Sequence, residues 1–129
     1  MKIKRPPSPL QKRARRGFRG YPVATIAFYG PDNSRASKVA VGVVTRAEGE
    51  AEVLERWFSE RADVRFDAGI GREILAFLER HAVKSVVLSG GVIGCPHEEG
   101  IDYPEGQVCP QCPYWATRDR WTGDLLHEQ

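Results

Sequence analysis

The chain lacks long apolar runs and contains little cysteine. It has no run of roughly 18 apolar residues, the length a transmembrane helix needs, so we expect no membrane-spanning segment. The first twenty residues are basic but lack the apolar middle of a secretory signal. Only three of the 129 residues are cysteine, and an odd number cannot pair fully into disulfides. We therefore expect a cytoplasmic protein with reduced cysteines.

Acidic residues are absent from residues 1–20, which carry eight Lys or Arg. The whole chain has 19 basic and 17 acidic residues, so the remainder has a formal charge of −6. Because the segment is also rich in proline and poor in apolar residues, we expect a disordered tail. Binding of a partner could induce a short helix over 10–16.

A basic run without counter-charges favours binding to the phosphates of nucleic acid. RNA is the favoured candidate partner over DNA. The alternatives are an unpartnered solubilising tail and an acidic protein or membrane surface, although no amphipathic stripe supports membrane anchoring. The candidate phosphate-binding residues of the tail are Lys12, Arg13, Arg15, Arg16 and Arg19.

Two segments rich in β-branched and aromatic residues follow the tail. Residues 21–29 and 38–45 both read as strands, and the cluster Gly-Pro-Asp-Asn-Ser at 30–34 reads as a turn. Together they predict a β-hairpin with a longer loop than the tightest type.

The next segments predict two helices and a buried strand. Apolar residues at 53, 54, 57 and 58 fit one face of a helix over 50–60, and Asp67 can cap a helix over 67–81. The strand at 85–88 is expected at the centre of the sheet. The predicted fold is α/β (α+β), a small mixed sheet over 21–94 followed by a zinc-knuckle module over 95–129.

All three cysteines lie close to a histidine in the pattern C-x-H-x11-C-x2-C. Zinc prefers four soft or borderline ligands in a tetrahedron, and Cys3His is a common structural set. The spacing therefore predicts a closed structural zinc site, although thiolate-rich sites also admit iron. The predicted ligands are Cys95, His97, Cys109 and Cys112.

Other interpretations of this segment remain open. Cys109 and Cys112 can form a redox pair, and water or a carboxylate can replace His97 as fourth ligand. The letters His-Glu-Glu and C-x-x-C also match part of a zinc deaminase signature. Only nine residues separate Glu99 from Cys109, too few for the strand and helix of such enzymes. Cys95 would also fill the position that a catalytic water needs.

Two groups of side chains surround the predicted metal ligands. The acidic residues are expected to form a solvated loop, or alternatively a docking face for a protein partner. Trp115 is expected to pack against the sheet. Trp121, with Arg118 and Arg120, is a candidate surface for unpaired bases. The acidic residues are Glu98, Glu99, Asp102 and Glu105.

These observations favour a small, non-enzymatic zinc-binding protein that contacts nucleic acid. A protein–protein adaptor and a zinc-dependent hydrolase or deaminase are the alternatives. The pattern identifies neither the partner nor the oligomeric state.

Overall fold

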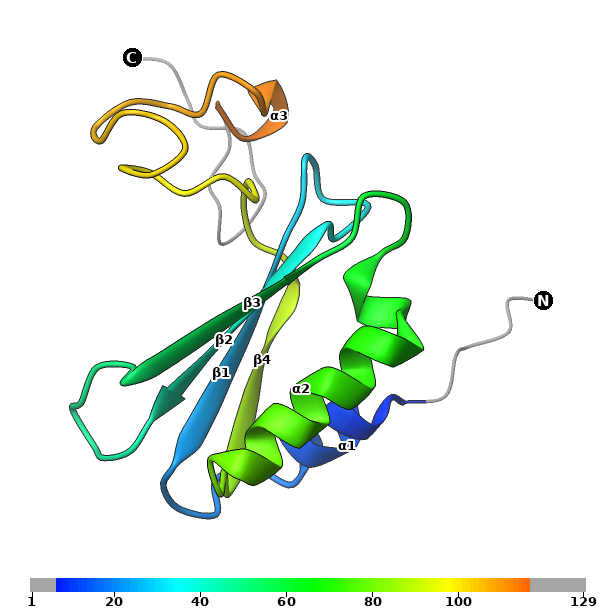
Figure 1. Ribbon diagram of the computed structural model, residues 1–129, viewed down its shortest axis with the longest axis vertical. Coiled ribbons are helices and arrows are strands. Elements are labelled where there is room, and N and C mark those ends of the chain that lie inside the picture. Colours follow the sequence, from blue (N-terminus) through cyan, green and yellow to red (C-terminus); the bar gives the residue numbers. More distant parts are fainter. Residues whose placement is uncertain (1–6, 117–129) are drawn as a thin grey trace.

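The computed structural model describes residues 7–116 of the chain. Within this range, four strands form one mixed sheet in the order β3-β2-β1-β4, and helices cover one of its faces (Figure 1). No helix in the described range has the length and apolar character to cross a membrane. The elements are α1 (Pro9–Arg15), β1 (Val23–Tyr29), β2 (Lys38–Val44), β3 (Val53–Phe58), the 3-10 helix η1 (Val64–Phe66), α2 (Ala68–Arg80), β4 (Ser85–Val92) and α3 (Pro113–Ala116).

The predicted β-hairpin is confirmed. Strands β1 and β2 pair antiparallel from Val23 opposite Val44 to Tyr29 opposite Lys38. In the turn, Asp32 Oδ1 accepts hydrogen bonds from the backbone N–H and hydroxyl of Ser34, as turn-forming Asp residues commonly do.

The helix predicted over 50–60 is wrong, because Val53–Phe58 form the edge strand β3. Apolar residues at 53, 54, 57 and 58 fit a helical face, but they equally place one apolar pair on each face of a strand. Trp57 faces the helices, where its ring meets that of Phe77 edge-on at 5.7 Å. Strand β3 also satisfies the hydrogen-bonding groups along the free edge of β2, which a helix cannot do.

The predicted helix over 67–81 is confirmed as α2. Asp67 accepts a hydrogen bond from the N–H of Ile70 at 2.9 Å, which caps the first turn. The inner face of α2 is fully apolar and buries Ile70, Ile74, Phe77 and Leu78 against the sheet.

The strand after α2 lies at an edge of the sheet and not at its centre. Strands β1, β2 and β3 occupy consecutive positions, so β4 pairs parallel with the remaining side of β1. Only part of the strand is buried, and Val87 is 55% exposed. The hydroxyl of Ser85 accepts from Arg19 N–H and donates to Gly20 O, both at 2.7 Å. The segment after α1 is thereby held against the start of β4.

Within the segment expected to be a disordered tail, Pro9–Arg15 form helix α1 in the structure. Ser8 and Gln11 form a reciprocal capping box, and Pro9 occupies the first turn, where its missing N–H costs nothing. Leu10 is buried and Ala14 packs against the core, so two small contacts one helical turn apart hold α1 to the domain. The sequence-based prediction gave weight to the many charged residues of this segment and did not recognise Leu10 and Ala14 as residues that could pack against the domain.

Asp63 joins the hairpin to η1 and yields a test of the fold. It accepts hydrogen bonds from the N–H groups of Ala36 and Arg65 and forms an ion pair with the Arg65 guanidinium at 2.6 Å. Burial acts to raise the pKa of Asp63, but the hydrogen bonds from Arg65 and Ala36 outweigh burial and hold the pKa below its usual value.

At neutral pH, Asp63→Asn should lower the free energy of unfolding by about 1–2 kcal/mol, because hydrogen bonds to a charged acceptor are lost. Because the pKa of Asp63 is lower in the folded protein than in the unfolded chain (about 3.9), its carboxylate stabilises the fold at pH values above about 3.9. This stabilisation is lost as the pH falls through the pKa of Asp63 in the folded protein. Denaturant unfolding at neutral and strongly acidic pH measures the difference. The exposed control Glu79→Gln should change little, and a difference that persists undiminished in acid would contradict this account.

Candidate functional site

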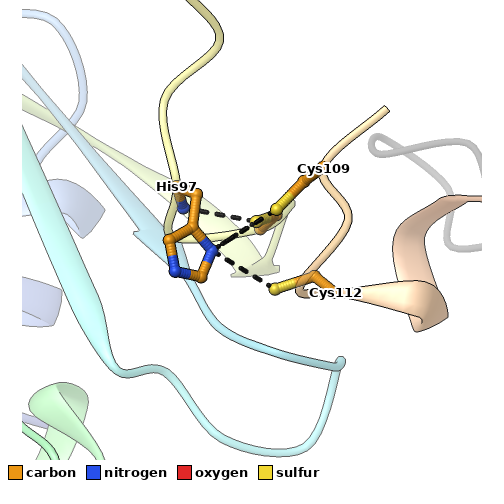
Figure 2. Close-up of side chains that lie close together, drawn as sticks. His97, Cys109 and Cys112 are labelled. Carbon is orange, nitrogen blue, oxygen red and sulfur yellow. Dashed lines mark hydrogen bonds between the residues drawn. The ribbon is translucent and has the colours of Figure 1, made fainter. Parts of the chain in front are cut away.

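The four predicted metal ligands lie in the segment beyond β4, past the ends of the strands (Figure 1). Cys95 and His97 come three and five residues after β4, and Cys112 directly precedes α3. The structure brings all four side chains together, and Figure 2 shows the His97 ring directed at Cys109 and Cys112.

The geometry of this Cys/His cluster suits a tetrahedral metal ion. His97 Nδ1 lies 3.1 Å from Cys95 Sγ and 3.5 Å from the sulfurs of Cys109 and Cys112. All four donor atoms lie within 4.8 Å of one another. Zn–S and Zn–N bonds of about 2.3 and 2.0 Å in a tetrahedron imply about 3.5 Å between nitrogen and sulfur. The cluster can therefore hold a metal ion.

Local backbone structure helps to aim these side chains. Cys95 Sγ accepts a hydrogen bond from the N–H of His97 at 3.2 Å, so the turn at Pro96 directs both residues to one point. At the other end, Trp115 N–H donates to Cys112 O and starts α3 directly after the last cysteine.

Burial disfavours the charged form of two thiols, those of Cys95 and Cys112. It raises the pKa of Cys95 and of Cys112, and the hydrogen bond that Cys95 donates to Cys112 raises that of Cys95 further. A bound cation reverses this preference, because the thiolate is the form that ligates metal. A redox C-x-x-C pair instead needs a thiol of lowered pKa at a helix N-terminus. The convergence of all four donor atoms within 4.8 Å favours a metal site over a redox pair.

Trp115 holds residues 95–112, hereafter the metal segment, against the sheet, in agreement with its expected packing role. Its indole Nε1–H donates to Gly30 O at 2.8 Å, and its ring packs against the core. The N–H of Gly30 donates to Gly94 O at 2.8 Å, directly before the first cysteine. A side chain at position 30 would lie 1.9 Å from Arg35 O, so only glycine fits this junction.

Glu98 does not belong to a solvated loop, which corrects the prediction for this residue. It forms an ion cluster with Lys38 and Arg56, hereafter the Glu98 ion cluster. Lys38 Nζ lies 3.0 Å from Glu98 Oε2 and also donates to Pro96 O at 3.0 Å. Arg56 Nη2 donates to Glu98 Oε1 at 2.7 Å. The hydrogen bond from Arg56 is the largest cause that lowers the pKa of Glu98, and Lys38 adds to it.

The Lys38 side chain is only 4% exposed. Strand β2 therefore holds the loop of residues 96–105, hereafter the metal loop, through a buried charge. Sequence reasoning did not identify Lys38 or Arg56 as part of the site. A lysine that begins the otherwise apolar strand KVAVGVV was a usable signal, because a buried lysine requires a partner.

The other acidic residues of the loop, Glu99, Asp102 and Glu105, are exposed. Asp102 accepts a hydrogen bond from the N–H of Glu98 at 2.7 Å and so stabilises the turn itself. The negative charge of the predicted acidic face is thus reduced, because Glu98 is paired with cations. Asp102 also takes part in a hydrogen bond within the loop.

The basic residues of the N-terminal segment lie on the outside of α1 and its C-terminal extension. Lys12, Arg15 and Arg16 are exposed and share one helical face, since they stand at i, i+3 and i+4. Arg13 is half-buried and Arg19 is exposed beyond the helix. None of these five cations forms an ion pair with a residue in the described range 7–116. The candidate residues Arg118, Arg120 and Trp121 lie outside that range.

Comparisons with family models, with curated proteins and with solved structures find no match to the chain.

The Glu98 ion cluster predicts that Lys38→Met loosens the metal loop without unfolding the domain. The hydrogen bonds to Glu98 and Pro96 are lost, whereas methionine fills the buried volume. Hydrogen exchange at the amides of Gly100 and Asp102, which bond within the loop, should become roughly tenfold faster or more. The exposed Lys84→Met is the control. Unchanged loop exchange in Lys38→Met would show that the ion cluster does not hold the loop.

Proposed function

We propose that this protein is a small, metal-stabilised, non-enzymatic domain that contacts nucleic acid, with RNA the favoured candidate over DNA. The observation that carries the proposal is the basic face of α1, formed by Lys12, Arg15 and Arg16. The helix is capped and anchored by buried Leu10, so these cations have a fixed spacing. They lack carboxylate partners in the described part of the chain, which leaves them available for phosphates.

Zinc is the proposed metal. Three sulfurs and one imidazole nitrogen exclude the hard cations that prefer oxygen, and tetrahedral Cys3His is a common structural zinc set. Four protein ligands leave no position for a reactive water, so the proposed role is to stabilise the segment. A hydrolase or deaminase is correspondingly disfavoured. A reducing compartment such as the cytoplasm would keep the thiols available.

The adaptor alternative has less support than nucleic-acid binding. Its acidic face included Glu98, whose charge is compensated by Lys38 and Arg56. The unpaired cations of α1 create a stronger electrostatic potential than the acidic residues do on the described surface. A positive potential of this kind attracts phosphate-rich partners.

Charge reversal on α1 tests the proposed interface. The triple variant Lys12→Glu, Arg15→Glu, Arg16→Glu should bind single-stranded RNA much more weakly than the wild type. Each phosphate contact contributes about −0.7 to the slope of log K against log salt for single strands, so the slope should shrink by about 2. Fluorescence anisotropy of a labelled oligonucleotide across a salt series measures both quantities.

The matched control reverses three exposed arginines elsewhere: Arg46→Glu, Arg61→Glu and Arg72→Glu. It has the same net charge as the α1 variant, so a general loss of positive charge would affect both equally. Equal loss in the two variants, or no salt-dependent binding by the wild type to RNA or DNA, would overturn the proposed interface.

The metal site is tested by comparing two histidines. The wild type should contain about one equivalent of zinc, and His97→Ala should lose most of it and unfold at lower temperature. His81→Ala is the control, because His81 ends α2 and contacts Phe77, away from the cluster. Elemental analysis and thermal unfolding measure the outcome. Full zinc content in His97→Ala would contradict the proposed ligand set, and iron in place of zinc would contradict the proposed metal.

A further inference from the structure

A hollow of about 300 Å³ lies beside the metal loop, on the sheet face opposite the helices. Its lining includes Tyr29, Ala40, Arg56, Glu99 and Tyr103. This volume is at the lower end of the range for ligand sites, which suits one ring system and not a larger ligand. Cys95, His97 and Glu98 form its wall on the side of the metal loop, and the functions proposed above do not use the space that they enclose.

The pairing of three strands creates the floor of this hollow. Tyr29 pairs with Lys38, and Lys38 pairs with Phe58, so the three form one row across the sheet. Lys38 Nζ lies 5.4 Å from the centre of the Tyr29 ring and 5.7 Å from that of Phe58. The next row contains Ala27, Ala40 and Arg56. Because its two alanines are small, the surface is recessed beside the aromatic row.

The charges around the hollow favour a neutral ligand over an anion. Lys38 and Arg56 are both paired with Glu98, so their charges are already partly compensated. Glu99 adds a negative charge, and a divalent metal held by three thiolates and a neutral histidine would carry a net charge of −1. A free phosphate or carboxylate group would therefore meet a net repulsive field in this hollow.

The polar groups instead match one edge of a nucleobase. The Glu99 carboxylate lines the hollow and forms no hydrogen bond or ion pair within residues 7–116, so it can accept two hydrogen bonds. Guanine presents two adjacent donors, N1–H and the N2 amino group, on its Watson–Crick edge. Adenine presents an acceptor nitrogen there, which would face the carboxylate unfavourably. Arg56 has N–H groups beyond those directed at Glu98, and these can donate to guanine O6.

We propose that this hollow binds one unpaired guanine base of an RNA strand. Glu99 accepts hydrogen bonds from N1–H and N2–H, Arg56 donates to O6, and the rings of Tyr29 and Tyr103 contact the base. Aromatic rings stabilise unpaired bases of any kind, so the preference for guanine depends on Glu99. The inference rests on the proposed RNA binding and adds base recognition to it.

The experiment compares two labelled oligouridylate dodecamers, one with a central guanosine and one with a central adenosine. The wild type should bind the guanosine strand roughly tenfold more tightly, since a bidentate pair discriminates by about that factor. Glu99→Gln cannot accept both hydrogen bonds, so its affinities for the two strands should become nearly equal. The control Glu105→Gln changes an exposed acidic residue outside the hollow lining and should retain the preference.

The triple charge reversal on α1 separates this inference from the proposed function. That variant should lose affinity for both strands by a similar factor and retain the ratio between them. If the wild type binds both strands equally, or if Glu99→Gln keeps the guanosine preference, the base site is wrong while the α1 interface stands. Binding of neither strand by the wild type overturns both.

Discussion

The turn end of the β1–β2 hairpin is the support on which the candidate site depends. Gly30 directly follows β1 and Lys38 begins β2, so both lie at this end of the hairpin, and both hold the metal segment. Gly30 uses its carbonyl for the Trp115 indole and its N–H for Gly94, while Lys38 uses its ammonium for Pro96 and Glu98. A segment with few apolar residues of its own needs such anchors, because it cannot offset its ordering entropy by burial. The segment that carries the Cys/His cluster and the hairpin therefore stabilise each other.

Where local chemistry and tertiary packing agree, the sequence was sufficient to predict the structure. Asp67 starts α2, the inner face of α2 is consistently apolar, and a cluster of turn residues joins β1 to β2. The Cys/His cluster was predictable for a similar reason, since the choice of donors is set by coordination chemistry and the spacing only has to permit closure. In these cases one strong signal has one structural solution.

Where one sequence pattern fits two kinds of secondary structure, contacts with the rest of the fold determine which one forms. The apolar residues of 53–58 suit a helix or a strand, and only the unsatisfied edge of β2 favours the strand. Helix α1 needed the surface of β4 and α2 before burial of Leu10 could stabilise it. Glu98 was expected in solvent because its partners, Lys38 and Arg56, come from strands about 60 and 40 residues earlier. Contacts at that separation leave no periodic trace in the sequence.

The distribution of charge also limits how a nucleic acid can lie on this protein. Outside residues 1–20 the chain has a formal charge of −6, so phosphates are repelled by most of it and attracted at α1. The proposed base site lies on the opposite face of the sheet from the helices and carries no net positive charge, so it cannot attract a strand from a distance. Electrostatics at α1 would supply affinity without selecting a sequence, and the hollow beside the metal loop would select a base without adding long-range attraction. Because the metal segment forms one wall of that hollow, loss of the metal should disturb base selection before it disturbs phosphate binding.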